Sequence, residues 1–159
     1  MSIQAHPSER RLVLRLLNYW RSVAEQRRWP SPGDFYPAVL PDLWRFCFLI
    51  DLTGDDRGGE RVFSYIGDFH REMYDVDLIG TAVAKADPNI LNSRATSYID
   101  DVVAREVPVT YGGQFTDSRG YSVLYRSILL PLSNDNETIC AILGAANCQE
   151  TSSDLAQSA

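Results

Sequence analysis

The stretch FCFLIDLTGDDRGGERVFSYIGDFHREMY, residues 46–74, decides how the rest of the chain is interpreted. It begins with an apolar, β-favouring run, residues 46–52, and continues with a polar loop rich in Gly and Asp, residues 53–60. A second β-rich run, residues 61–66, follows, and Asp68 can then cap a short helix. The stretch therefore predicts a β-hairpin that leads directly into helical structure.

Two longer helices and three further strands complete the predicted order. Apolar side chains recur at three- and four-residue steps over residues 8–28 and again over residues 89–106, which predicts an amphipathic helix in each segment. The last third alternates as strands do, with turn residues between the runs at residues 109–116, 121–132 and 138–147. Sequential hairpins imply an antiparallel sheet covered on one face by helices, so the predicted fold class is α+β.

Length and composition are those of one soluble domain. The chain has 159 residues, of which 45% are hydrophobic and 23% charged. Its formal net charge of -6 argues against general nucleic-acid binding. No apolar run reaches the roughly 20 residues that span a membrane, and the N-terminus lacks the apolar core of a signal peptide. We therefore expect a cytoplasmic protein, in which the three cysteines, Cys47, Cys140 and Cys148, are reduced.

The N-terminal helix has a wide apolar stripe and an arginine-rich opposite face. The stripe either covers the chain's own sheet or pairs with the same helix of a second chain, and we predict a homodimer that uses it. Its candidate interface residues are Leu12, Leu16, Trp20 and Val23. The arginine face is either a docking surface for an acidic partner or a solvated helix face.

The order of the elements resembles the PAS domain, which has two strands, a helical middle that ends in one longer helix, and three strands. Short local words resemble a bacterial stand-alone PAS-like family and cover most of residues 12–147. They are Leu17-Asn18-Tyr19-Trp20, Asp34-Phe35-Tyr36-Pro37, Leu40-Pro41, Phe48-Leu49-Ile50-Asp51, Tyr65-Ile66-Gly67, Leu129-Leu130-Pro131-Leu132-Ser133 and Ile142-Leu143-Gly144-Ala145.

This resemblance implies a PAS-like five-stranded antiparallel sheet with helices on one face, preceded by the additional amphipathic helix. The expected divisions are residues 1–29 for the N-terminal helix, 30–148 for the PAS-like domain and 149–159 for a disordered tail. It also implies a non-catalytic sensory or regulatory module that signals through an unknown partner protein. Such a module either binds a small molecule between the sheet and the long helix or serves as a ligand-free dimerisation adaptor.

The cofactors of known PAS domains are disfavoured by residue type. Haem-binding PAS domains that sense oxygen use a histidine on the long helix, and residues 89–106 contain none. Flavin photoreceptors of this fold carry a cysteine in a motif after the second strand, and that motif is absent here. The resemblance therefore leaves the ligand unknown.

We find no catalytic or metal-binding pattern. The two imidazoles, His6 and His70, form no pair that could build a metal site. His70 is either a ligand contact at the pocket mouth or a partly exposed helix residue. The acidic pairs Asp55-Asp56 and Asp100-Asp101 are expected in solvent, where paired acid–base chemistry is disfavoured.

The pocket implied by the resemblance would be lined by aromatic residues and arginines. Its candidate residues are Phe63, Tyr65, Met73, Tyr74, Arg94, Tyr98, Tyr111, Tyr125 and Arg126. The alternative is a filled core in which the tyrosine hydroxyls find partners and Arg126 points to solvent. Tyr125 and Arg126 are neighbours and must point to opposite faces. We predict that Tyr125 points inward, because Val123 and Leu129 share its face.

Overall fold

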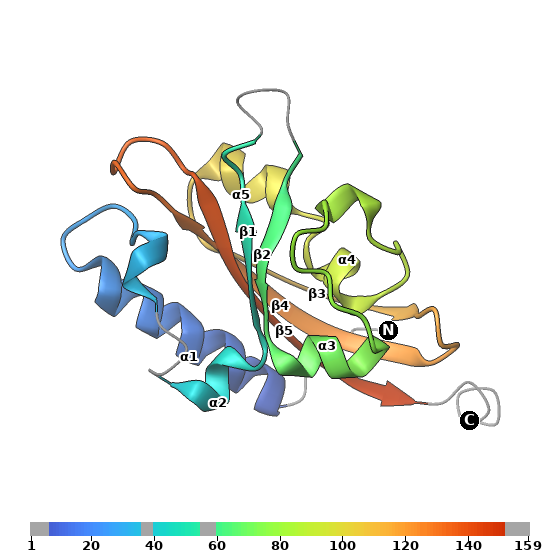
Figure 1. The fold of residues 1–159 in the computed structure, drawn as a ribbon. Helices are drawn as coiled ribbons and strands as arrows, with labels where there is room; N and C mark the ends of the chain where they lie inside the picture. Colours follow the sequence, from blue (N-terminus) through green and yellow to red (C-terminus); the bar gives the residue numbers. More distant parts are fainter. Residues whose placement is uncertain (1–6, 36–39, 55–59, 152–159) are drawn as a thin grey trace.

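The computed structural model describes residues 7–35, 40–54 and 60–151, with side chains from residue 11 onward (Figure 1). Residues 55–59 of the predicted polar loop at 53–60, and residues 152–159 of the predicted tail at 149–159, lie outside this description. The elements in chain order are α1 (Pro7–Ala24), a 3-10 turn (Pro32–Asp34), α2 (Pro41–Trp44), β1 (Cys47–Asp51), β2 (Val62–Ile66), α3 (Asp68–Tyr74), a second 3-10 turn (Val83–Lys85), α4 (Leu91–Ala95), α5 (Ile99–Arg105), β3 (Val109–Thr116), β4 (Ser122–Leu132) and β5 (Ala141–Thr151).

The five strands form one antiparallel sheet in the order β2-β1-β5-β4-β3. The predicted α+β class and the antiparallel sheet are confirmed. Strands β2 and β3 are the edges, while the long pair β4 and β5 forms the middle of the sheet. Strand β5 ends at Thr151, so the first residues of the predicted tail belong to the sheet.

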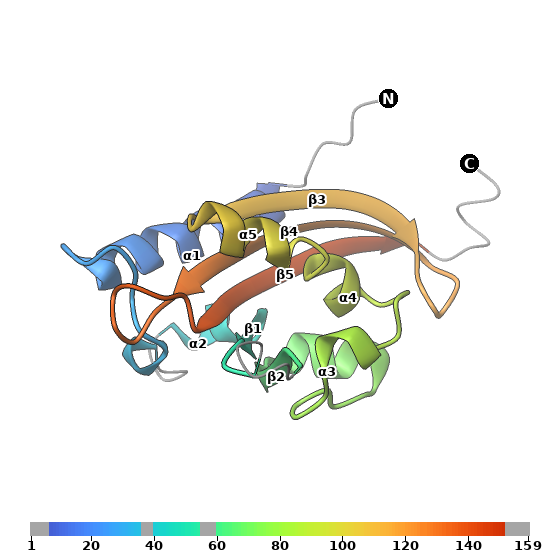
Figure 2. The same ribbon diagram turned by 90° about the horizontal axis from the view of Figure 1, so that it is seen from above.

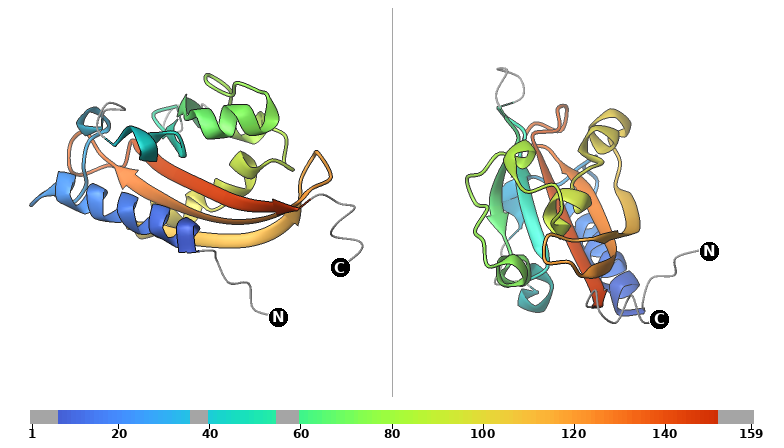
Figure 3. Two further views of the ribbon diagram at one scale, coloured as in Figure 1. Left: turned by 90° about the horizontal axis from the view of Figure 1, so that it is seen from below. Right: turned by 90° about the vertical axis from the view of Figure 1, so that its right-hand side faces the viewer.

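Helices lie on both faces of the sheet, as Figures 2 and 3 show. Helices α3, α4 and α5 cover one face, which we call the inner face. Helix α1 runs along β4 and β5 on the opposite, outer face. None of the helices in the described ranges is long and apolar enough to cross a membrane.

Two separate hydrophobic clusters correspond to these two faces. The inner cluster contains Phe48 and Leu129 and joins the sheet to α4 and α5. The outer cluster contains Trp44 and Leu130 and joins the sheet to α1 and α2. Because neighbouring residues of β4 fall in different clusters, the alternation of the strand supplies both layers.

Helix α1 is held by its apolar stripe against the chain's own sheet. Leu12, Leu16 and Trp20 are 6%, 1% and 7% exposed in the single chain. The indole Nε1 of Trp20 donates a hydrogen bond of 3.0 Å to the backbone oxygen of Pro131 on β4. The structure therefore shows the sheet-covering alternative. Three of the four residues predicted for a dimer interface, Leu12, Leu16 and Trp20, are thus buried within one chain, and Val23 is partly buried. A dimer through this stripe stays a prediction.

The single long helix predicted over residues 89–106 is two short helices, α4 and α5. The break falls at Thr96, whose hydroxyl donates to the backbone oxygens of Asn92, at 2.7 Å, and Ser93, at 3.2 Å. Ser97 likewise bonds back to Arg94. Side-chain hydrogen bonds of this kind compete with the helical ladder, which explains why the pattern continues while the helix does not.

Candidate functional site

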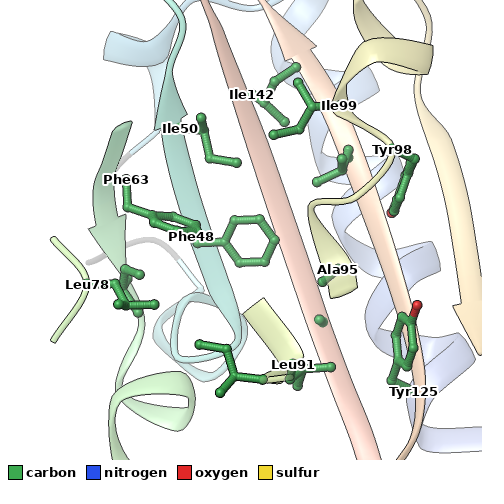
Figure 4. Close-up of a cluster of buried hydrophobic side chains, with 14 of the residues drawn as sticks. Phe48, Ile50, Phe63, Leu78, Leu91, Ala95, Tyr98, Ile99, Tyr125 and Ile142 are labelled. Atoms are coloured by element: carbon green, nitrogen blue, oxygen red, sulfur yellow. The ribbon is translucent and has the colours of Figure 1, made fainter. Parts of the chain in front are cut away.

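The inner face is where the resemblance places a ligand, and side chains fill it. Figure 4 shows Phe48 lying among residues of the strands and of α4 and α5. The rings of Phe48 and Phe63 meet edge to face with centroids 6.2 Å apart, and both side chains are fully buried. Leu91 and Ala95 reach the same cluster from α4, and both are 0% exposed. The layer is therefore a packed core along this part of the sheet.

Among the tyrosines that the structure describes, Tyr98 and Tyr125 are the two that are buried in this layer. The Tyr98 hydroxyl lies 2.8 Å from the hydroxyl of Ser127 on β4, and burial raises the pKa of Tyr98, so it stays a neutral phenol. Tyr125 packs edge to face on Phe115, with ring centroids 5.8 Å apart. Its inward orientation is the one that the alternation predicts, and both hydroxyl-bearing rings are nearly buried.

Tyr65 and Arg126 were candidate pocket residues, and the structure places both away from the inner layer. Tyr65 packs on Trp44 of the outer cluster, with ring centroids 5.5 Å apart. The cause is a bulge: the pairing of β1 with β2 skips Ser64, which reverses the faces of the residues before and after it. Arg126 lies on the outer face, because it shares that face with Ile128.

The other candidates lie around the rim of the inner layer. Met73 and Tyr74 are partly buried at the end of α3. Arg94 is exposed and covers the ring of Phe115, with its guanidinium carbon 4.8 Å from the ring centroid. Tyr111 is 50% exposed on the edge strand. Of the nine candidates, the structure brings Phe63, Tyr98 and Tyr125 into one cluster, with Met73, Tyr74, Arg94 and Tyr111 at its margin.

Tyr74 belongs to a polar network that joins α3, α4 and the β3–β4 turn. Its hydroxyl donates to Asp117 at 3.1 Å and accepts a hydrogen bond of 3.0 Å from the Leu91 backbone nitrogen. Arg119 binds the same carboxylate at 2.7 Å and also pairs with Glu150. Burial alone would raise the pKa of Asp117, but the hydrogen bonds from Arg119, the Tyr121 backbone and Tyr74 outweigh it and lower this pKa.

His70 is fully buried, so it is not the partly exposed helix residue that was one of the two roles considered from the sequence. It is 1% exposed, its Nε2 lies 2.8 Å from the Phe46 backbone oxygen, and burial lowers its pKa to about 4. Its Nδ1 is buried without a hydrogen-bond partner in the described part of the chain, as is Nδ2 of Asn92 on α4. One signal could have located His70: it lies one turn beyond the end of β2, on a helix that must cover the sheet.

The arrangement does not fit a flavin held through a thiol. Cys47 lies on β1, Cys148 on β5 and Cys140 just before it, so none comes from the helical layer. The thiol of Cys47 contacts the Leu43 backbone oxygen at 3.4 Å, and burial raises its pKa. Within the described ranges, no group of three or more His, Cys, Asp or Glu side chains could hold a metal ion.

Comparisons with known proteins agree with this architecture. A family model described as the PAS domain matches residues 5–147. This chain belongs to the PAS domain family. PAS domains are generally sensory, non-catalytic modules, and the coarse functional class of this chain is that of a sensory module family. None of the curated proteins matches the chain at a significant level.

Solved structures share the fold at low sequence identity. A light-oxygen-voltage domain from work on a flavin analogue is 14% identical, with 79% of this chain and 93% of that chain covered and a TM-score of 0.51. The PAS domain of BvgS from Bordetella pertussis is 15% identical over 70% of this chain and 82% of that one, with a TM-score of 0.49. The light-oxygen-voltage domain of a blue-light activated histidine kinase from Erythrobacter litoralis is 12% identical over 66% and 95%, with a TM-score of 0.47. These similarities concern the fold alone.

Proposed function

We propose that this PAS domain is a non-catalytic regulatory module that acts through contact with a partner protein. The observation that carries the proposal is the packed inner layer. Phe48, Leu91 and Ala95 are 0% exposed and fill the space between the sheet and α4. When a domain's own side chains fill its inner layer, no room is left there for a ligand, so it contacts other molecules through its surface.

Site-specific photo-crosslinking in the native cell tests this function. A crosslinking amino acid is placed, one position at a time, at exposed residues on different faces, such as Leu14 on α1, Ile79 after α3 and Tyr111 on β3. Positions on one of these faces should repeatedly capture one defined partner protein. The captured partner, once purified, should bind the isolated domain with a measurable dissociation constant. Capture of no defined partner from any face would contradict the proposal.

Small-molecule sensing is the second candidate, and one observation favours it. Nδ1 of His70 and Nδ2 of Asn92 are buried polar atoms of the helical layer that have no partner in the described residues. Such atoms are costly unless a water or a ligand satisfies them. A metabolite that raises the melting temperature of the wild type, and fails to do so for Asn92→Leu, would support this candidate.

A homodimer remains part of the proposal, and an edge of the sheet is an alternative interface to the α1 stripe. Strand β3 is an edge of the sheet and pairs along its length with β4 alone among the described strands. Its eight residues, VTYGGQFT, carry no charge, whereas the whole chain carries a net charge of -6. A second copy can therefore pair edge to edge about a two-fold axis without like-charge repulsion. Thr110→Lys, on this exposed edge, should convert a sedimenting dimer to a monomer.

A further inference from the structure

A hollow lies beside the N-terminal half of α1, where the outer face meets α3. Its volume is about 480 Å³. The walls are formed by α1, by α2 and the two residues after it, by α3 and by β5. The lining of the hollow joins outer-face residues to Phe69 and Cys148, which pack against the inner cluster, and it contains none of the nine residues predicted for the inner pocket. Its lining residues are Arg11, Leu12, Arg15, Asp42, Arg45, Phe46, Phe69, Asn147 and Cys148.

The hollow is positively charged on a chain that is negative as a whole. Three arginines line it against one carboxylate, Asp42, which is already bound by Arg15 at 2.8 Å. Arg11 and Arg45 form no ion pair with any residue that the structure describes, although the Arg45 guanidinium lies over the Phe46 ring at 5.1 Å. Two guanidinium groups are therefore available to an anionic group that enters the hollow.

Asn147, which lines the hollow, belongs to a pair of outer-face residues with buried polar atoms that lack partners in the described part of the chain. Asn147 on β5 lies directly opposite Arg126 on β4, and both are partly buried on the outer face. Within the described residues, the Asn147 Oδ1 and the Arg126 Nε are buried and have no hydrogen-bond partner. A partly buried guanidinium and a buried carbonyl oxygen require, respectively, an acceptor and an N–H donor.

One wall of the hollow is apolar. The rings of Phe46 and Phe69 are in tilted contact with centroids 4.9 Å apart, and Leu12 lies on the α1 side. The hollow thus offers cations, one hydrogen-bond acceptor and an apolar surface together. Inorganic phosphate can satisfy the cations and, through a P–OH group, the acceptor, but it leaves the apolar wall uncovered. A polypeptide with carboxylates, backbone N–H groups and an apolar side chain satisfies all three.

We propose that this hollow docks an acidic segment of a partner protein, with carboxylates on Arg11 and Arg45 and an apolar side chain on the Phe46–Phe69 wall. The inference rests on the proposed function and specifies the chemistry of the partner. It also assigns a role to the arginine-rich face of α1, which the sequence left open between docking and solvation.

Fluorescence anisotropy with a labelled peptide, Glu-Leu-Glu-Phe-Asp-Glu, tests the proposal on the full chain. The peptide should bind with an affinity that falls between 50 mM and 300 mM salt, and the amide counterpart, Gln-Leu-Gln-Phe-Asn-Gln, should bind about tenfold or more weakly. Arg11→Gln and Arg45→Gln should each weaken binding by about tenfold. Arg21→Gln is the matched control, because Arg21 is exposed on the same helix and does not line the hollow.

Equal weakening by Arg21→Gln would show attraction by general charge and would overturn the proposal. Binding of the amide peptide as tight as that of the acidic one, or no binding of the acidic peptide at all, would do the same. Circular dichroism should show unchanged melting for the three variants, whose side chains are all exposed. A crosslinked partner that binds Arg11→Gln and wild type equally well would overturn the docking site while leaving the partner-contact function intact.

Discussion

The ring of Phe48 occupies the space above Gly144. The two residues lie directly opposite each other in the β1–β5 pair, and a Cβ placed on Gly144 would come within 2.3 Å of the ring. Because residue 144 has no side chain, the Phe48 ring fits into the space that a Cβ there would fill, and Phe48 is 0% exposed. This contact is the base on which the inner layer is packed.

Gly144→Ala should therefore destabilise the fold by roughly 1–3 kcal/mol, because neither the ring nor the strand backbone has room to move. Urea denaturation gives the free energy of unfolding. Gly33→Ala is the control, since its added Cβ would meet only the Ser31 hydroxyl at an ordinary 3.7 Å and should change stability by less than about 0.5 kcal/mol. Equal stabilities of the two variants would refute the contact.

Two leucines of α1 test whether this helix is part of the folded domain. Leu16 is 1% exposed against the sheet, whereas Leu14 is 56% exposed on the same helix. Leu16→Ala should cost about 2–5 kcal/mol of unfolding free energy, and Leu14→Ala should stay within about 0.5 kcal/mol of wild type. A Leu16→Ala variant as stable as wild type, but changed in subunit number, would support the stripe as a dimer interface.

Burial of His70 predicts a specific dependence of stability on pH. Its pKa is lowered to about 4 in the folded chain, against about 6.5 in an unfolded one. Well above pH 6.5 the residue is neutral in both states and contributes no pH dependence. As the pH falls from 6.5 to 4, only the unfolded state takes up the proton, so the folded state loses up to about 3 kcal/mol.

The variant His70→Gln removes this titration. Urea denaturation at intervals from pH 7.5 to pH 4 should show a smaller loss of stability for the variant than for wild type, with the difference opening below pH 6.5. The carboxylates titrate in both proteins and cancel in the comparison. Parallel stability curves for the two proteins would mean that His70 is accessible to protons in the folded state.

The hydroxyl of Tyr74 should contribute to stability through its two hydrogen bonds. Tyr74→Phe leaves the Leu91 backbone nitrogen without its acceptor and removes one donor from Asp117, so it should cost about 1–3 kcal/mol. Tyr121→Phe is the matched control. Tyr121 also stacks on Arg119, with the guanidinium carbon 4.5 Å from its ring, and its hydroxyl forms no hydrogen bond within the described ranges. Similar losses of unfolding free energy for both variants would show that the packing of the rings, and not the Tyr74 hydroxyl, stabilises this network.

Much of the fold can be predicted from the sequence, because the spacing of apolar residues indicates which face of each helix or strand is buried. The hairpin of β1 and β2, the turn at Asp117 and the inward orientation of Tyr125 all follow from alternation and turn residues. Where a local hydrogen bond interrupts a regular element, the pattern gives no warning. Thr96 divides the predicted long helix by bonding back to Asn92, and its side chain is compatible with either outcome.

The candidate site was harder to predict, because it depends on which face of the sheet each strand residue occupies and on which helices cover that face. A single skipped residue, Ser64, moves Tyr65 from the inner layer to the outer cluster, and no residue type signals such a bulge in advance. The arginine hollow combines residues from α1, β5 and the segment after α2, which are distant in sequence. Periodicity identified the arginine face of α1. It could not identify Asn147 as a neighbour of that face, because the two come together only when β5 takes its place in the sheet.

Native mass spectrometry of freshly purified protein tests the central claim most directly, because it reports both bound mass and subunit number. The claim is that the inner layer is a packed core and that the domain acts through its surface. The spectrum should then show the mass of one or two chains with no additional small molecule. A stoichiometric bound molecule, lost on Asn92→Leu, would contradict the packed-core account and make this PAS domain a small-molecule sensor.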